Sequence, residues 1–130
     1  MKAAAARAGN LRFVDRERGE IEVNPTACGD VVLARKDVAT SYHLAVTLDD
    51  AAQGITLVTR GEDLLHATHI HRILQALLGL PEPEYWHHRL LRDAHGRRYA
   101  KRDRDRTIRD LRQSGHSPAA VRELAGFAPA

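Results

Sequence analysis

Alternating hydrophobic and polar positions predict a β-hairpin near the start of the chain. Segments 11–15 (LRFVD) and 20–24 (EIEVN) change character at nearly every residue, and the polar stretch 16–19 between them ends in a glycine. A period of two is typical of a half-buried strand, and a short glycine-bearing connection is typical of antiparallel neighbours.

Two compact apolar runs predict buried strands. The first is 29–35 (GDVVLAR), and the second is 55–60 (ITLVTR), which follows Gly54. Short continuous runs of this kind are typical of parallel strands that are covered on both faces. We expect a third strand within 81–91, after the loop that begins with PEPE.

The spacing of other apolar residues predicts helices between and after these strands. Segment 42–53 has a helical apolar face, although positions 44, 46 and 48 also fit a strand. Segment 67–80 has a stronger face, and Gly79 stands where a left-handed residue ends a helix. The members of that face are Ile70, Ile73, Leu74, Leu77 and Leu78.

Two further helices are expected near the end of the chain. The first is a charged segment at about 105–113. The second begins after Ser117, which is a good N-cap, with Pro118 at the first helical position and Gly126 at its end. The turn DAHGRR lies between the third strand and these helices.

The resulting order of strands and helices is β-α-β-α-β. It predicts an α/β fold: a partial Rossmann-type parallel sheet with an N-terminal hairpin and C-terminal helices, forming a single domain over 1–130. Such sheets bind ligands at the carboxyl ends of their strands. Arg35, Arg60 and the region of Arg89 lie at or near those predicted ends.

Composition indicates a folded protein of a reducing compartment. Hydrophobic residues make up 43% of the chain and charged residues 28%, which excludes a disordered polymer. No apolar run reaches the roughly 18 residues that span a bilayer, and the first residues make a poor secretory signal. Cys28 is the only cysteine, so neither an internal disulfide nor a cysteine-rich zinc knuckle is available. We expect a cytoplasmic protein without a membrane partner.

Positive charge is concentrated in one tract. Residues 89–112 contain ten Lys or Arg and four Asp, so the tract carries a net charge of +6 and the rest of the chain −3. A solvated helix face has this composition, and so does a surface that binds a phosphate-bearing partner. Composition alone leaves both interpretations open.

Three histidines lie within six positions, which raises the question of a metal site. A helical zinc pair needs histidines four residues apart, whereas His66 and His69 are three apart and His69 and His71 are two apart. Two positions correspond to about 200° around a helix, so His69 and His71 point nearly oppositely. We therefore expect no metal ligation here, and we interpret His69 and His71 as solvent-facing.

Arg60 is the more informative residue of this region, because it ends a predicted buried strand just before Gly61. An arginine in that place presents a planar, permanently charged fork to a ligand carboxylate. The competing interpretation is an internal ion pair with one of the nearby acidic residues, Glu62, Asp63 or Asp50. Local sequence does not separate the two.

A set of ordered motifs extends from 41 to 102: Tyr-x-Leu-Ala, Asp-Asp, Gln-Gly-x-Thr, Arg-Gly-x-Asp-Leu, Leu-Leu-Gly-Leu-Pro and Pro-x-Tyr-x-His. The set resembles the second half of the catalytic domain of glutamyl-tRNA synthetases, and most of all their shortened relatives, the glutamyl-Q tRNA(Asp) synthetases. The resemblance covers about 11–127. It implies a class I aminoacyl-tRNA synthetase, which is a nucleotide-binding ligase.

The resemblance also implies roles for individual residues. Tyr42 and Arg60 match positions that contact the glutamate substrate. Lys101 matches the second lysine of the family's second signature, which is catalytic and contacts the ATP phosphates. Arg98 replaces the first lysine of that signature and keeps its charge for ATP binding. Ala100 replaces a serine and lacks its hydroxyl donor.

The reaction implied by the resemblance is ATP-dependent activation of L-glutamate and its transfer to tRNA. In the glutamyl-Q relatives the acceptor is the queuosine base of tRNA(Asp). ATP is then a substrate, accompanied by Mg, and we expect no zinc in this chain.

The family's first signature, a His-Ile-Gly-His type tetrapeptide, is absent. HIHR at 69–72 lacks the glycine that allows close approach to ATP. We therefore expect a truncated or split enzyme that is inactive or very weak alone. It would work with a separate N-terminal half or by self-association. The alternative is a non-catalytic nucleotide-binding or RNA-binding module derived from this fold.

Overall fold

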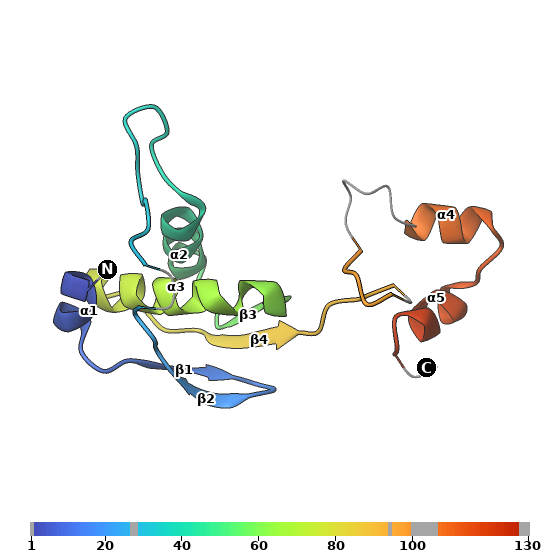
Figure 1. The fold of residues 1–130 in the computed structure, drawn as a ribbon, viewed down its shortest axis with the longest axis horizontal. Helices are drawn as coiled ribbons and strands as arrows, with labels where there is room; N and C mark the ends of the chain where they lie inside the picture. The colour runs from blue at the N-terminus through green and yellow to red at the C-terminus, as the bar shows by residue number, and fades with distance from the viewer. Residues whose placement is uncertain (1, 27–28, 94, 100–106, 128–130) are drawn as a thin grey trace. The chain divides into compact units, whose positions relative to one another are not determined.

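The computed structural model describes residues 2–26, 29–93, 95–99 and 107–127 (Figure 1). The chain divides into two compact units, Met1–Arg89 and Leu90–Ala130. The expectation of a single domain over 1–130 stays a prediction.

The first unit is built on a four-stranded sheet with the order β2-β1-β4-β3. Its strands are β1 (Arg12–Asp15), β2 (Gly19–Glu22), β3 (Leu57–Gly61) and β4 (Glu84–His88). β1 and β2 pair antiparallel, whereas β4 runs parallel to both β1 and β3. The sheet is therefore mixed and mostly parallel, which confirms the α/β fold class with its N-terminal hairpin.

The hairpin forms because its turn has the residue that the backbone requires. Gly19 has φ 76°, a left-handed conformation in which a side chain is strained. It pairs with Asp15 at the closed end of the hairpin, and Phe13 pairs with Ile21 in the middle. The predicted hairpin is confirmed, with β2 beginning and ending slightly earlier than the alternation suggested.

The described residues of this unit also form three α-helices and a short 3-10 helix: α1 (Lys2–Ala8), α2 (Tyr42–Ala52), η1 (Glu62–Leu64) and α3 (Leu65–Leu78). α1 and α2 both pack against α3. The helical interpretation of the α2 segment is confirmed over the strand alternative. Gly79 ends α3 with φ 64°, as its position predicted.

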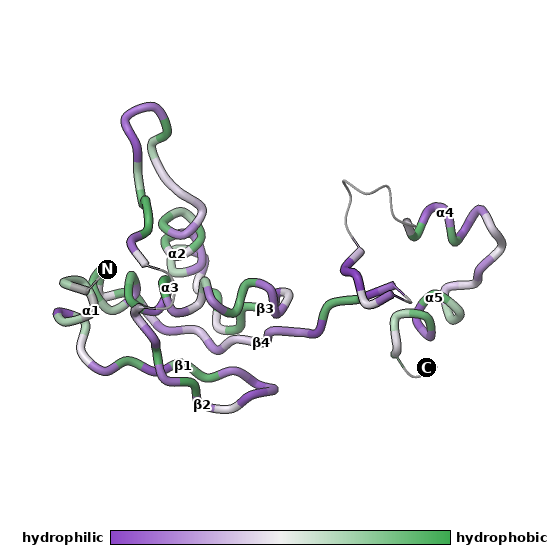
Figure 2. The backbone as a smooth tube through the Cα atoms, in the orientation of Figure 1, coloured by the Kyte–Doolittle hydropathy of each residue, from purple (hydrophilic) through white to green (hydrophobic). Residues whose placement is uncertain are grey.

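The predicted strand at 29–35 is wrong. The described backbone there is irregular, and Val32 is 61% exposed. This segment pairs instead with the residues that follow it: Arg35 N–H donates to the Val38 carbonyl at 2.9 Å, and Ser41 N–H donates to the Leu33 carbonyl at 2.7 Å. The result is a loop with a hydrophilic tip (Figure 2). β1 lies beside β4 and runs parallel to it, and Arg35 does not end a strand.

The core of the first unit lies between α3 and one face of the sheet. Along β4, Tyr85 and His87 are buried while their neighbours are exposed, which is the alternation of a strand with one covered face. Phe13 meets Tyr85 edge-to-face, with ring centroids 5.5 Å apart. The buried apolar residues are Phe13, Ala67, Ile70, Ile73, Leu74 and Tyr85. Of the apolar face predicted for α3, Leu77 and Leu78 are exposed.

The second unit contains two short helices, α4 (Ile108–Gln113) and α5 (Pro118–Leu124). Thr107 and Asp110 form a reciprocal capping box at the start of α4. Ser117 caps α5 by accepting a hydrogen bond from the Ala120 N–H at 3.2 Å, as predicted. The predicted helix at 105–113 is confirmed for its described part, and residues 105 and 106 lie outside the described residues.

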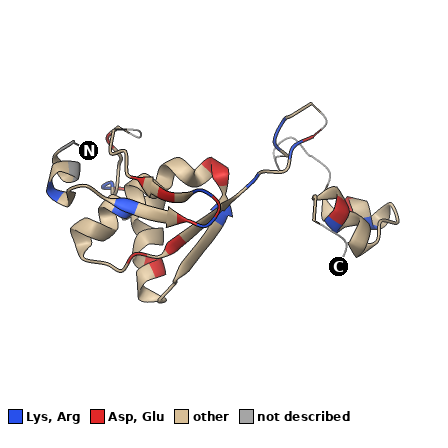
Figure 3. Cartoon of the chain, turned by 90° about the horizontal axis from the view of Figure 1, so that it is seen from below, with Lys and Arg blue, Asp and Glu red and all other residues tan. Residues whose placement is uncertain are grey.

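Within the described part of the chain, no helix is long and apolar enough to cross a membrane. Figure 3 shows acidic and basic positions interspersed over the first unit rather than gathered on one element. Several of them form ion pairs, such as Arg16 with Glu84 at 2.8 Å and Arg72 with Glu82 at 2.7 Å.

Candidate carboxylate-binding site

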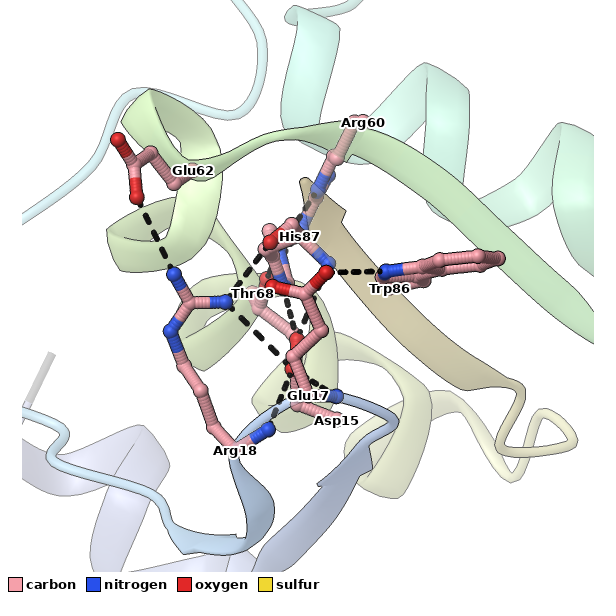
Figure 4. Close-up of polar contacts among 8 residues, drawn as sticks. All are labelled: Asp15, Glu17, Arg18, Arg60, Glu62, Thr68, Trp86 and His87. Carbon is pink, nitrogen blue, oxygen red and sulfur yellow. Dashed lines mark hydrogen bonds and ion pairs between the residues drawn. The ribbon is translucent and has the colours of Figure 1, made fainter. Parts of the chain in front are cut away.

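Arg60 lies near the carboxyl end of β3, and its guanidinium group is held by three uncharged side chains. Its Nε–H donates to His87 Nε2 at 3.1 Å, and its Nη1–H donates to His71 Nδ1 at 3.1 Å. Its Nη2–H donates to the hydroxyl of Thr68 (Figure 4). His71 and Thr68 come from α3 and His87 from β4, so the site joins three elements.

This arrangement fixes the arginine without neutralising it. A guanidinium group has five N–H bonds. Three of them are used here, which leaves one on each terminal nitrogen. Within the described residues no ion pair joins Arg60 to a carboxylate, and Glu62 pairs with Arg18 at 3.2 Å instead. The geometry therefore favours the ligand-binding interpretation of Arg60 over an internal ion pair.

Asp50, one of the three acidic residues considered as partners of Arg60, has a pKa that is affected by the charge of Arg60. Burial raises the pKa of Asp50, the charge of Arg60 lowers it, and the charge of Asp49 raises it, with a net upward shift. The influence of Arg60 is thus electrostatic and does not outweigh burial. A second negative charge near Arg60, such as a substrate carboxylate, would meet an arginine whose terminal nitrogens are still available.

Beneath Arg60, His87 is bound to a buried carboxylate. Its Nδ1–H donates to Asp15 Oδ2 at 2.6 Å, and neither side chain is exposed. Asp15 also accepts from the backbone N–H groups of Glu17 and Arg18 at 3.0 Å and of His87 at 3.2 Å. The hairpin turn and β4 are therefore tied together at this carboxylate.

The titration of this pair follows from its surroundings. Burial alone would raise the pKa of Asp15, but hydrogen bonds from His87 and from three backbone N–H groups bring it below its ordinary value. Burial lowers the pKa of His87, the hydrogen bond to Asp15 opposes this, and the charge of Arg60 lowers it again. The net shift of His87 is downward, which favours a neutral imidazole beside Arg60.

On the other side of Arg60, two imidazoles and a tyrosine are in contact. His71 Nε2 lies 3.0 Å from His43 Nδ1. Tyr42 meets both rings edge-to-face, with centroids 5.8 Å from His71 and 5.5 Å from His43. Because Arg60 donates to Nδ1 of His71, the remaining proton of that imidazole is on Nε2 and is donated to His43. Tyr42 and Arg60, both predicted from sequence, thus each contact His71.

The interpretation of His71 and His69 as solvent-facing is wrong. His71 is only 3% exposed, and burial, followed by the charge of Arg60, lowers its pKa to about 3. His69 is half-buried: it lies edge-to-face against Phe13 and its Nδ1 accepts from the Asn24 N–H at 3.2 Å. The physical reason is that α1 and α2 pack against α3, and its polar side chains also meet residues of β1 and β4, so its polar side is enclosed as well.

The two histidines nevertheless diverge, as their spacing predicted. Among the residues that the structure describes, no three His, Cys, Asp or Glu side chains are grouped to hold a metal ion. Cys28 lies outside the described residues. The absence of zinc stays a prediction.

The predicted ATP-binding residues belong to the second unit. Arg98 is exposed and forms an isolated antiparallel bridge with Arg92, closed by a turn at Gly96. Lys101, Arg102 and Ala100 lie outside the described residues. Their roles are proposals.

Sequence reasoning missed four residues of the site: Asp15, His43, Thr68 and His87. The alternation in 84–88 was a usable signal for His87, because it places that histidine on the same face as Tyr85. Asp15 gave no comparable signal, since it lies 72 positions from His87 along the chain.

The fold and the site together define an α/β domain in which three uncharged side chains hold an arginine near the carboxyl end of β3. Over residues 1–127 the chain matches the family tRNA synthetases class I (E and Q), catalytic domain, and it belongs to this family. The resemblance seen in the motifs is thereby confirmed, and the chain is a member of a ligase family.

Individual relatives agree with this assignment. The chain is 54% identical to the glutamyl-Q tRNA(Asp) synthetase of Rhodobacter capsulatus, covering 98% of this chain and 47% of that protein. It is 36% identical to a glutamate–tRNA ligase of Desulfitobacterium hafniense, covering 88% of this chain and 24% of that protein. The chain thus spans less than half the length of these relatives.

A solved structure supports the fold. The crystal structure of a glutamate tRNA ligase from Elizabethkingia meningosepticum, in complex with its amino acid, superposes with a TM-score of 0.63 at 30% sequence identity. The superposition covers 84% of this chain and 20% of that one.

Proposed function

We propose that this chain supplies the glutamate-recognising part, and a portion of the ATP-binding part, of a glutamyl-Q tRNA(Asp) synthetase-type ligase in the cytoplasm. The glutamate carboxylate attacks the α-phosphorus of ATP, pyrophosphate leaves with the electrons of the broken P–O bond, and glutamyl adenylate forms. The glutamyl group is then transferred to queuosine of tRNA(Asp). The 54% identity to the R. capsulatus protein supports this substrate assignment over glutamyl-tRNA synthesis.

The observation that carries the proposal is the state of Arg60. Its three neighbours are hydrogen-bond acceptors without charge, and one N–H remains on each terminal nitrogen. A carboxylate accepts two parallel N–H bonds from such a fork, which is the strongest geometry that arginine offers. Glutamate has two carboxylates, and one of them is the ligand that we assign to Arg60.

Tyr42 is proposed as the second recognition residue. It is the first residue of α2 and is 51% exposed, so its ring is accessible while its edge rests on His43 and His71. A tyrosine in this place supplies an apolar wall and one O–H donor to a bound amino acid. Tyr42 and Arg60 both contact His71, so one side chain links the two proposed recognition residues.

For ATP we propose Arg98 and Lys101, with Mg on the phosphates. Both residues are cationic, and charge on the leaving pyrophosphate is what an adenylate-forming site must stabilise. The glycine-bearing first signature is not in these 130 residues. The activity therefore requires a segment that carries it, on the same or on a separate polypeptide.

The test of the proposal is Arg60→Ala in the enzyme completed with that segment from a glutamyl-Q relative. Truncating one partner of a buried charged pair costs about 2 kcal/mol or more. We therefore expect the glutamate KM in ATP–pyrophosphate exchange to rise about 30-fold or more. Arg12→Ala is the matched control, because Arg12 is an exposed arginine of the same unit that pairs with Glu20 at 3.2 Å.

An unchanged glutamate KM in Arg60→Ala would assign Arg60 a structural role and contradict the proposal. A second outcome would favour the binding-module alternative. This is the absence of glutamate-dependent exchange in the completed wild-type protein, together with tRNA binding that weakens as salt rises. The observation behind that alternative is Ala100, which removes a hydroxyl donor from the second signature.

A further inference from the structure

Asp15 and His87 form a fully buried pair directly beneath Arg60, and neither residue touches solvent. Burying a carboxylate is costly unless its oxygens are satisfied. Asp15 is satisfied by three backbone N–H groups and one imidazole N–H. Burial of this pair is costly, and His87 contacts Arg60 directly, so the pair can influence the position of that arginine.

The hydrogen bonds around His87 can run in one direction only. A guanidinium N–H donates and cannot accept, so His87 Nε2 must be an unprotonated acceptor of the Arg60 Nε–H at 3.1 Å. The imidazole proton is therefore on Nδ1, where Asp15 Oδ2 accepts it at 2.6 Å. Thr68 fits the same direction, since its hydroxyl accepts from Arg60 and lies 2.9 Å from His87 Nε2, to which it donates.

We propose, resting on the function assigned above to Arg60, that Asp15 and His87 are positioning residues for glutamate binding. Asp15 selects the His87 tautomer whose bare Nε2 holds the Arg60 Nε–H. The guanidinium is thereby fixed from its Nε side by His87 (Figure 4). Its remaining N–H bonds are then left for the substrate carboxylate.

The His87 imidazole, which lies between the charges of Asp15 and Arg60, is essential to this arrangement. A carboxylate in direct contact with Arg60 would fix the arginine but would also occupy the charge that the substrate must meet. His87 links Asp15 to Arg60 by two hydrogen bonds, and the Nε2 atom that contacts Arg60 carries no proton and no charge. The negative charge of Asp15 is met locally by the turn N–H groups, with Arg18 Nη1 lying 3.6 Å away.

Asp15→Asn tests the proposal because it changes one atom and reverses the hydrogen bond. If the amide nitrogen takes the place of Oδ2, it donates to His87 Nδ1, which forces the proton onto Nε2. Two N–H groups then face each other between His87 and Arg60. We expect the glutamate KM of the completed enzyme to rise by on the order of 10- to 100-fold through misplacement of the arginine, with the ATP KM unchanged.

The tautomer of His87 distinguishes a positioning role of Asp15 from a purely structural one, because general destabilisation would not transfer the imidazole proton from Nδ1 to Nε2. Nitrogen-15 NMR of the full 130-residue chain should show His87 protonated on Nδ1 in the wild type and on Nε2 in Asp15→Asn. Arg16→Ala is the matched control. It removes another arginine side chain of the same hairpin turn, whose exposed ion pair with Glu84 at 2.8 Å involves neither Asp15 nor His87. It should keep the wild-type tautomer and change the glutamate KM by no more than about 3-fold, as exposed ion pairs do.

A second pair of variants keeps the proposal falsifiable if Asp15→Asn does not fold. His87→Gln retains a carbonyl that can accept from Arg60, whereas His87→Leu has no acceptor. We expect a small rise of the glutamate KM in His87→Gln and a rise about 10-fold larger in His87→Leu, the difference expected for one hydrogen bond to a charged group. Equal values in the two variants would overturn the positioning role.

The outcomes also separate the two proposals. A wild-type His87 with its proton on Nε2, or a reversed tautomer with an unchanged glutamate KM, would overturn the positioning role. If Arg60→Ala raises the glutamate KM and Asp15→Asn does not, the positioning role fails while the glutamate role of Arg60 stands. If Arg60→Ala has no effect, the proposed function itself fails.

Discussion

Histidines around Arg60 have lowered pKa values because they are wholly or partly buried, and this makes the stability of the folded protein depend on pH. His71 has its pKa lowered to about 3, and burial, the largest cause, also lowers the pKa of His43, His69 and His87. Each of these histidines is neutral in the folded protein at a pH where the unfolded chain would bind a proton. Asp50, whose pKa is raised, acts with the opposite sign.

We predict that the folded state loses stability as the pH falls from about 6.5 towards about 3, with His71 contributing strongly. The unfolded chain binds a proton at His71 in this range and the folded chain does not. The contribution is therefore complete above the ordinary histidine pKa and declines below it, by at most about 1.4 kcal/mol per pH unit for one group.

His71→Gln is the variant that checks this, because an amide can accept from Arg60 and donate to His43 without titrating. Urea unfolding between pH 7 and pH 4 should give a shallower fall of the unfolding free energy in the variant than in the wild type. His95→Gln, which removes an exposed imidazole from the second unit, serves as the control. Parallel curves for wild type and His71→Gln would contradict the assignment.

The same residues show what sequence could reveal of the site. Arg60 was found because it ends an apolar run that predicts a strand, and Tyr42 because it belongs to an ordered set of motifs. The strand itself is confirmed as β3, but it lies at the edge of the sheet and none of its residues is buried. His71 was misplaced, since periodicity indicates which residues share a helix face but not how many neighbours cover that helix. The partnership of Asp15 with His87 spans 72 positions, so no local pattern contains it.

Among the secondary-structure elements, prediction succeeded where local chemistry decides the outcome. The β1–β2 turn has Gly19 at positive φ, and α3 ends at Gly79 with φ 64°. The strand predicted at 29–35 failed for a different reason. An apolar run forms a strand only if its backbone pairs with a neighbouring strand, whereas here Arg35 N–H donates to the Val38 carbonyl and Ser41 N–H to the Leu33 carbonyl within the same segment. Apolar patterning does not reveal which partner the backbone will take.

The end of α3 provides a prediction at this scale. Gly79 is left-handed, and an added Cβ there would meet no atom within 4 Å, so the cost of substitution is conformational rather than steric. We expect Gly79→Ala to lower the unfolding free energy by about 1 kcal/mol or slightly more. Gly79→Asn should cost less, because asparagine tolerates this conformation better.

Thermal or urea unfolding of the three proteins measures the effect. The order of stability should be wild type, then Gly79→Asn, then Gly79→Ala. A Gly79→Ala protein as stable as the wild type would mean that the left-handed end of α3 is not maintained in solution.

At the scale of the whole molecule, the chain covers 47% of the R. capsulatus protein and matches one family throughout 1–127. The first unit holds Arg60 and Tyr42, and the second holds Arg98. Sequence motifs predicted this family correctly because several short motifs fall in order, which a single tetrapeptide could not have done.

The last prediction concerns catalysis by these 130 residues alone. Adenylate formation needs the carboxylate, the α-phosphate and the leaving pyrophosphate in line, with charge stabilised from both sides. Arg98 and Lys101 are proposed for one side. The family uses its glycine-bearing first signature on the other, and HIHR at 69–72 does not replace it, because His71 is buried against Arg60 within α3.

Loss of a single preorganised donor typically costs about 10²–10³ in rate, and here a group of donors is missing. We therefore expect the purified chain to show glutamate-dependent ATP–pyrophosphate exchange at least about 10³-fold slower than the completed protein. The measurement is exchange by the 130 residues with and without a separately expressed segment that carries the first signature. Exchange that appears only on mixing supports a divided active site, whereas rapid exchange by the chain alone would show that both sides of the site are already within it.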